Sequence, residues 1–166
     1  MPKLKWPRLR MRRGGAACVA VLALGLAVAG AGWYQHEQAR QRDVAVRQSL
    51  AAATAAAQAI FSYDYRSFDT SVANGRAFAT GQFADEYAKT TAALKPQAVS
   101  EQAIVRAAVS ASGVVTARPQ RVELLLYLNQ YRRNTNVTGE KVDQNRVVLT
   151  MVPVKEAWLV SHAVAI

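Results

Sequence analysis

The sequence lacks the residues that would build a disulfide or a metal centre. Its 166 residues include one cysteine, Cys18, and two histidines, His36 and His162, which are far apart in the chain. A single cysteine allows neither an intrachain disulfide nor a cysteine-based metal site, and neither histidine has a partner at ligand spacing. We therefore expect no metal and no cofactor.

Acidic residues are absent from the first thirteen positions, which carry six of the 21 basic residues. The other 15 basic residues face 11 acidic ones, a balance of +4, so most of the net charge of +10 belongs to a short tail. A nucleic-acid-binding protein needs a clustered basic surface on its folded part. The sequence shows no such cluster, and we do not expect nucleic-acid binding.

Charge is also absent from residues 14–34. About 20 apolar residues at ~1.5 Å each are enough to cross a ~30 Å hydrocarbon core as a helix. Arg12 and Arg13 precede this run, and Trp33 and Tyr34 end it. The positive-inside rule then predicts a cytoplasmic tail at 1–13, a plasma (inner) membrane span at 14–34, and an extracytoplasmic remainder.

A cleaved signal peptide is the alternative interpretation of this run. Ala29-Gly30-Ala31 has the small residues of a cleavage site, and Arg12-Arg13 has the form of a twin-arginine signal. The apolar run is longer than the ~7–15 residues typical of a signal peptide, which favours a retained anchor. Both interpretations place the rest of the chain outside the cytoplasm.

A long helix is predicted after the apolar run, because no proline or glycine interrupts residues 35–61. Its first part, 35–45, is charged and is interpreted as a stalk, and the domain itself is predicted at 46–166. One apolar stripe at helical spacing is made by Val46, Leu50, Ala53, Ala57 and Ile60. We expect this stripe to pack on a sheet, with a short coiled-coil seam as the alternative.

Residues 61–87 gather aromatic side chains among acidic ones. Ser67 or Asp69 can cap a short helix at 69–74 that Gly75 closes, and a second helix is predicted at 82–94, ended by Pro96. The acids thus have duties as caps and first-turn charges. None is expected in the apolar pocket that would suit catalysis, and we predict no catalytic residue and no enzyme.

The second half of the chain alternates as strands do, at 103–112, at 121–131, at 146–154 and at 157–164, and Gly113 permits a kink or bulge before a continuation at 114–117. Residues 132–145 are interpreted as a polar loop. The predicted strand at 121–131 puts Val122, Leu124, Leu126 and Leu128 on one face. Its other face carries the best polar cluster and possible ligand face, which consists of Glu123, Tyr127 and Asn129. Helices followed by about four antiparallel strands predict an α+β, cone-like domain with a curved sheet.

Several motifs resemble those of the actinobacterial Mce-associated membrane proteins, whose domain is similar to the nuclear transport factor 2-like cone. The motif residues in this chain are Tyr63, Asp64, Thr80, Gly81, Phe83 and Tyr87, joined by Gly113-Val114-Val115, Asn129-Gln130 and Trp158. The resemblance implies a non-catalytic, single-pass accessory protein that stabilises an Mce-type importer of sterols or fatty acids in the cell envelope. Its partners would be the Mce transporter subunits.

Two other functions fit the same outline. An inner-membrane assembly protein of a type IV secretion system shares this topology and cone, and its gene would have that of a secretion ATPase as a neighbour. A ketosteroid-isomerase-like enzyme would use the cone as a pocket, with Glu123, Tyr127 and Asn129 as its polar cluster. A lipid-binding cone would be lined by Leu124, Leu126 and Leu128, although plain core is the favoured interpretation of these leucines. The sequence leaves the oligomeric state open.

Overall fold

The structure, a computed structural model, describes residues 13–166, with the side chains at 13–25 and 27–29 excepted. The predicted basic tail therefore lies outside the described residues, apart from the backbone of Arg13. Contacts divide the chain into two units, residues 1–40 and 41–166. The functional site described below belongs wholly to the second unit.

The predicted membrane span, residues 14–34, has helical backbone throughout, as part of α1. Most of its side chains are outside the described set. Among the residues that the structure describes, no helix is long and apolar enough to cross a membrane.

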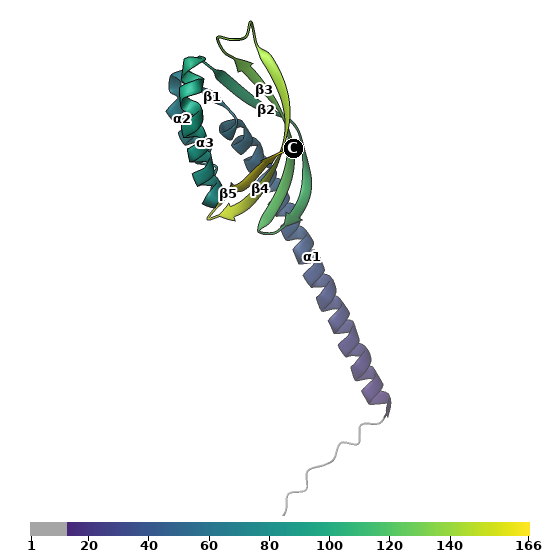
Figure 1. The fold of residues 1–166 in the computed structure, drawn as a ribbon. Helices are drawn as coiled ribbons and strands as arrows, with labels where there is room; N and C mark the ends of the chain where they lie inside the picture. The colour runs from purple at the N-terminus through teal and green to yellow at the C-terminus, as the bar shows by residue number, and fades with distance from the viewer. Residues whose placement is uncertain (1–12) are drawn as a thin grey trace, which may run out of the picture. The chain divides into compact units, whose positions relative to one another are not determined.

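Helices come first and long strands follow. The helical elements are α1 (Arg13–Ile60), the single 3-10 turn η1 (Tyr65–Ser67), α2 (Phe68–Arg76) and α3 (Gly81–Ser100). The strands are β1 (Tyr63–Asp64), β2 (Ile104–Arg118), β3 (Arg121–Arg133), β4 (Lys141–Val154) and β5 (Ala157–Ala165). Figure 1 shows α2 and α3 side by side on the hollow side of the curved sheet. The α+β class predicted from the sequence is confirmed.

The sheet has five strands in the order β1-β2-β3-β4-β5, and every neighbouring pair is antiparallel. The sequence predicted about four strands because β1 has only two residues, too few to show alternation. Tyr63 and Asp64 pair with Val105 and Ile104 at the start of β2. This short strand ties the end of α1 to the sheet.

The core lies between the second half of α1 and the hollow face of the sheet. Ala53, Ala57 and Ile60 of the predicted stripe are buried, and Val46 and Leu50 pack against them. The sheet side of the core consists of Val122, Leu124, Leu126, Leu128, Val147, Leu149, Met151, Trp158 and Val160. The apolar stripe therefore packs on the sheet, as predicted, through side chains that α1 and the strands bury together.

Helix α3 corrects a predicted boundary. It continues through Pro96 to Ser100, although proline cannot donate a backbone hydrogen bond. Ala98, two residues further on, is buried, and Glu101 N donates to Gln97 O at 2.9 Å. Tertiary packing of the last turn outweighs the local cost of the proline. Helix α2 likewise runs past the predicted end at Gly75, to Arg76.

The predicted loop at 132–145 is mostly strand. β3 and β4 stay paired out to Arg132 and Lys141, so only residues 134–140 connect them. Most side chains in this segment are polar, so the sequence does not show the apolar–polar alternation of a strand. The segment contains two ion pairs instead, Arg132–Asp143 at 2.8 Å and Arg133–Glu140 at 3.6 Å. Opposite charges on facing strands support a ladder that has little apolar surface.

The kink or bulge predicted at Gly113 is displaced along β2. The strand is continuous through Gly113, and bulges occur at Ser110 and Val115, each an extra residue that has no direct partner on β3. Such bulges bend and twist a strand without ending it. The curvature that the sequence placed at glycine is therefore produced on both sides of it.

Candidate functional site

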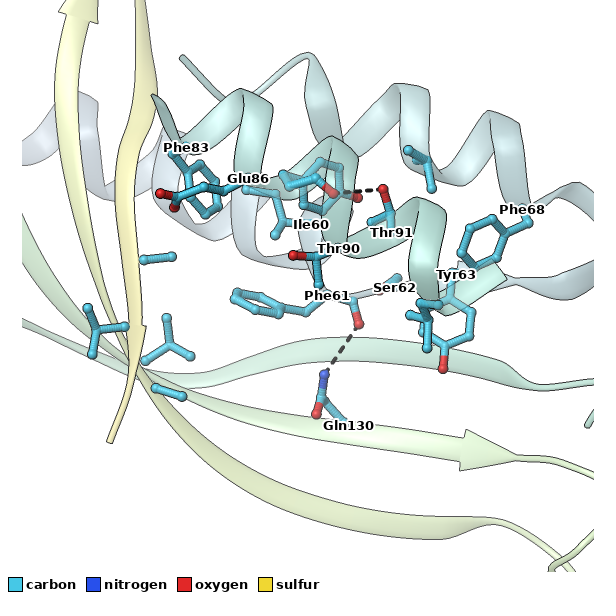
Figure 2. A pocket seen from close by; sticks show the side chains of 17 residues that line it. Ile60, Phe61, Ser62, Tyr63, Phe68, Phe83, Glu86, Thr90, Thr91 and Gln130 are labelled. Atoms are coloured by element: carbon cyan, nitrogen blue, oxygen red, sulfur yellow. Dashed lines mark hydrogen bonds between the residues drawn. The ribbon is translucent and has the colours of Figure 1, made fainter. Parts of the chain in front are cut away.

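A cavity of about 490 Å³ lies between the end of α1, helices α2 and α3, and the ends of β4 and β5. Figure 2 shows its labelled side chains converging from these elements. Its apolar lining includes Ile60, Phe61, Tyr63, Phe68, Val72, Phe83, Tyr87, Leu94, Val147 and Ala163. The volume lies within the ~300–1,000 Å³ of typical small-molecule sites. The cavity can therefore accept an apolar group of considerable size.

Few polar groups face this cavity, and most are satisfied within the domain. Gln130 Nε2 donates to Phe61 O at 3.4 Å, and Thr91 Oγ1 donates to Tyr87 O at 2.7 Å (Figure 2). The one lining carboxylate, Glu86, is exposed at the rim and accepts a hydrogen bond from Gln82 Nε2 at 2.6 Å. The cavity is thus an apolar space with a polar rim.

The phenols in the cavity wall are unsuited to act as bases. Burial raises the pKa of Tyr87, and burial also raises the pKa of Tyr63, where nearby Arg132 opposes part of the effect. Both side chains therefore stay protonated near neutral pH. Since Glu86 is exposed, the cavity offers no desolvated carboxylate of the kind that proton-transfer enzymes use.

The motif residues predicted from the sequence take structural positions around this cavity. Tyr63 packs edge-on against Phe68 with ring centroids 5.5 Å apart, and Phe83 and Tyr87 pair at 6.3 Å. Asp64 caps η1 by accepting from Arg66 N at 2.9 Å. Tyr63, Phe83 and Tyr87 line the cavity itself.

Thr80 and Gly81 shape the entry to α3. Thr80 N donates to Val160 O at 2.9 Å, which joins the α2–α3 connection to the edge of β5. Gly81 has φ +58°, in the left-handed region that a residue with a Cβ adopts at a cost. The pair therefore sets the direction of the helix that carries Phe83 and Tyr87.

The predicted polar cluster does not come together as one site. Tyr127 and Asn129 line a shallow hollow of about 340 Å³ with Ser110, on the face of the sheet away from the core. Glu123 does not line that hollow. It is held instead by Arg121, at 3.1 Å, and by Thr116 Oγ1, which donates at 3.1 Å.

The hydrogen bonds of Glu123 lead to a prediction about the pKa of its carboxyl group. The hydrogen bond from Arg121, with a smaller contribution from Thr116, holds the pKa of Glu123 below its usual value. We expect carbon-detected NMR titration to give a midpoint below the ~4.3 of an unperturbed glutamate, and Arg121→Ala to raise it. Because the pKa is lowered on folding, the contribution to stability is present above ~4.3 and lost as the pH falls through the lowered midpoint. A midpoint above the usual value would contradict this environment.

Residues of the cavity were only half visible in the sequence. The stripe Phe83, Tyr87 and Leu94 was recognised as one side of a helix, but Phe61 lies in the turn after α1, and Gln130 and Val147 lie on β3 and β4. Leu124, Leu126 and Leu128 are buried in the core and do not line this cavity. The favoured interpretation of these leucines as plain core is confirmed.

A fluorescent apolar probe tests whether the cavity is accessible. We expect 1-anilinonaphthalene-8-sulfonate to bind the folded protein with enhanced fluorescence, and Ala163→Leu, which adds three carbons to the lining, to reduce the binding severalfold. Ala157→Leu, at an exposed position outside this cavity, is the matched control. Equal probe binding by the two variants, both with native circular dichroism, would show that the probe binds elsewhere.

Comparison with known proteins gives a fold and no family. The sequence matches no protein-family model, and no curated protein matches it. Solved structures do resemble it. An IcmL-like type IV secretion system protein from Legionella pneumophila has a TM-score of 0.60 at 16% identity, covering 75% of this chain and 91% of that one.

Two further structures give a similar result. The periplasmic domain of DotI has a TM-score of 0.59 at 14% identity, with 70% of this chain and 91% of that one covered. CagV, a VirB8 homologue of the type IV secretion system of Helicobacter pylori, has a TM-score of 0.57 at 11% identity, with coverage of 69% and 93%. Helices on a curved antiparallel five-stranded sheet thus form a nuclear transport factor 2-like cone, as the sequence predicted.

These likenesses correct the predicted function. The predicted role in Mce-type lipid import is contradicted, because similar solved structures include an IcmL-like type IV secretion protein and a VirB8 homologue. No family model supports the resemblance to Mce-associated proteins. The motif residues explain the error. Tyr63, Asp64, Thr80, Gly81, Phe83 and Tyr87 connect strands, start helices and pack rings, so they indicate the cone and do not identify its partner.

Proposed function

We propose that this chain is a membrane-anchored assembly component of a type IV secretion system, with its cone outside the cytoplasm. The likeness of the whole domain carries the proposal. The IcmL-like protein, the DotI domain and CagV are each covered over at least nine-tenths of their own length, so the likeness includes every layer of the cone. A domain matched end to end is a stronger reason for a shared role than a matched motif.

The N-terminal sequence supports the same placement. An uncharged run at 14–34 follows six basic residues, the pattern of a single-pass anchor whose N-terminus stays in the cytoplasm. The DotI structure is that of a periplasmic domain. In our proposal the cone of this chain occupies the equivalent compartment and meets its partners there.

We further propose that the cone has a non-enzymatic role. The cavity described above is apolar, the buried Tyr87 and the half-buried Tyr63 in its wall have raised pKa values, and its lining carboxylate is exposed. Among the described residues there is also no group of three or more His, Cys, Asp or Glu side chains that could hold a metal ion. Protein contacts, rather than chemistry, are the activity that these surfaces suit.

Affinity isolation from native membranes tests this function. The full chain would carry a C-terminal tag at its chromosomal locus, and the isolated proteins would be quantified by mass spectrometry. The matched control keeps residues 1–45 and the tag but replaces the cone with an unrelated folded domain. We expect secretion-channel proteins and a secretion ATPase to be enriched by the full chain alone. Equal recovery by the control, or recovery of no secretion component, would contradict the proposal.

A further inference from the structure

One edge of the sheet is covered by another segment of the chain, whereas the other edge is largely unpaired. At the β5 edge, Thr80 N donates to Val160 O at 2.9 Å and Val160 N donates to Phe78 O at 2.8 Å, so the α2–α3 connection covers the strand. At the other edge, β1 pairs only with Ile104 and Val105 of β2, and Ser62 Oγ accepts from Ala107 N at 2.8 Å. Within residues 13–166, nothing pairs with the outer side of β2 from 108 to 118.

The register shows which backbone groups this open edge presents. Ala107 N–H points to the β1 side, and backbone direction alternates along a strand, with each bulge adding one residue. The outward N–H groups beyond Ala107 are therefore those of Val109, Ser112, Val114 and Ala117. These four residues lie opposite Leu128, Leu126, Leu124 and Val122 of β3, all of them buried.

Apolar side chains of the sheet are consequently left exposed to solvent at this edge. Leu124 is completely buried, whereas Val114, its direct neighbour on β2, is 48% exposed. Val115, in the second bulge, is 53% exposed. An additional strand beside β2 would continue both the hydrogen-bond ladder and the apolar surface.

The open stretch carries no charge or proline that would oppose pairing. Natural edge strands are protected by lysine, proline, inward charges or bulges. Of these devices the stretch has only the two bulges, at Ser110 and Val115. Residues 107–117 of β2 contain no charged residue and no proline. Arg106 and Arg118 flank the stretch but do not interrupt it.

We propose that this edge of β2 pairs with the same edge of a second copy of the chain, antiparallel about a two-fold axis at Gly113. Two sheets of five strands then form one continuous sheet. In this register Val109 faces Ala117 of the partner copy and Ser112 faces Val114, so all four outward N–H groups enter the ladder and the bulges lie opposite each other. Arg118 faces the uncharged Ala108. Arg106 stays outside the paired stretch, so no two arginines oppose each other.

A second copy fits because the stretch is self-complementary. It is neutral, so it does not repel itself, and the exposed valines meet at the centre of a symmetric contact. About nine residues at ~3.3 Å give a paired length of roughly 30 Å. One strand edge is a small interface, so we expect a weak dimer whose population rises with concentration. The proposal concerns self-association and does not depend on the secretion role.

Disulfide trapping in the full-length protein tests the pairing directly. In a Cys18→Ser background, Gly113→Cys would face its own copy, where strand geometry allows Cα atoms close enough for a disulfide. Nothing lies within 4 Å of a Cβ built at Gly113. Tyr127→Cys is the control, since it is 43% exposed but lies on β3 away from the edge. We expect mild oxidation in detergent micelles to link Gly113→Cys chains at least ~10-fold faster than Tyr127→Cys chains.

Two edge variants decide whether the trapped contact is a strand pairing. Ser112→Pro removes an outward N–H, and Val114→Lys places a charge at a half-exposed position on the same edge. Both should lower the Gly113→Cys linkage about tenfold, while Ser112→Thr, which keeps the N–H, should leave it within about twofold. Circular dichroism establishes that each variant is folded. Linkage no faster than that of Tyr127→Cys, or linkage unaffected by folded Val114→Lys, would overturn the proposal, as would capture of the edge by a different protein.

Discussion

Leu126→Ala is expected to lower the free energy of unfolding by about 2–5 kcal/mol. Leu126 is completely buried at the centre of β3, between Leu124 and Leu128 on the face that meets α1. Removing its three terminal carbons loses transfer free energy and leaves a cavity that the surrounding strands can close only in part. Urea unfolding followed by circular dichroism measures the change.

The matched control is Leu125→Ala, one residue away on the opposite face of the same strand. Leu125 is only half-buried, so its truncation should cost less than ~1.5 kcal/mol, although the chemical change is identical. If the two variants lost equal stability, the register of β3 and the position of the core would both be wrong.

Gly75→Ala is the second change with a large expected effect. A Cβ at this buried position would lie 2.8 Å from Tyr87 Cζ and 3.1 Å from the backbone oxygen of Ala59, and closer still to the Tyr87 hydroxyl. Such contacts force a shift of α2 or of the Tyr87 ring, and overpacking of this kind costs about 1–3 kcal/mol. Thermal and urea unfolding measure the loss.

A double-mutant cycle assigns that loss to the Tyr87 contact. Tyr87→Phe removes the hydroxyl that the new Cβ would meet, so the double variant should recover part of the stability. Gly113→Ala is the control, because nothing lies within 4 Å of a Cβ built there, and its effect should stay within about 0.5 kcal/mol. Additive effects of Gly75→Ala and Tyr87→Phe would show that the two residues do not touch.

Some elements were predictable because one physical signal decided them. The stripe from Val46 to Ile60 and the alternation from Val122 to Leu128 placed the α1–sheet core correctly, since both are governed by burial of apolar surface. The hairpin at Lys155-Glu156 was likewise visible, and Lys155 adopts φ +56° there. Periodicity is reliable where one face of an element is buried and the other is not.

Other elements were missed because long-range contacts decide them. The outer ladder of β3 and β4 depends on ion pairs such as Arg132–Asp143, which no local pattern reveals. Pro96 is tolerated because the last turn of α3 is packed. Gly75 leaves room for the ring of Tyr87, which belongs to another helix, α3. Each of these features depends on residues that meet only in the folded domain.

The candidate site shows the same limit. One wall of the cavity, Phe83 with Tyr87, could be read from helical spacing, but the opposite wall is assembled from α1, β3 and β4. The function was harder still, because the motif residues have structural positions in the cone and carry no information about a partner. Likeness of the entire domain to solved structures shows the fold, and the role in secretion is our proposal from it.

Secretion by the native host tests the central claim most directly. The gene for this chain would be deleted in frame, and export of the secreted substrate measured against complementation with the full chain and with the anchor that carries an unrelated domain. The account predicts that deletion abolishes export, that the full chain restores it, and that the anchor alone does not. Normal export by the deletion strain would contradict a role in secretion.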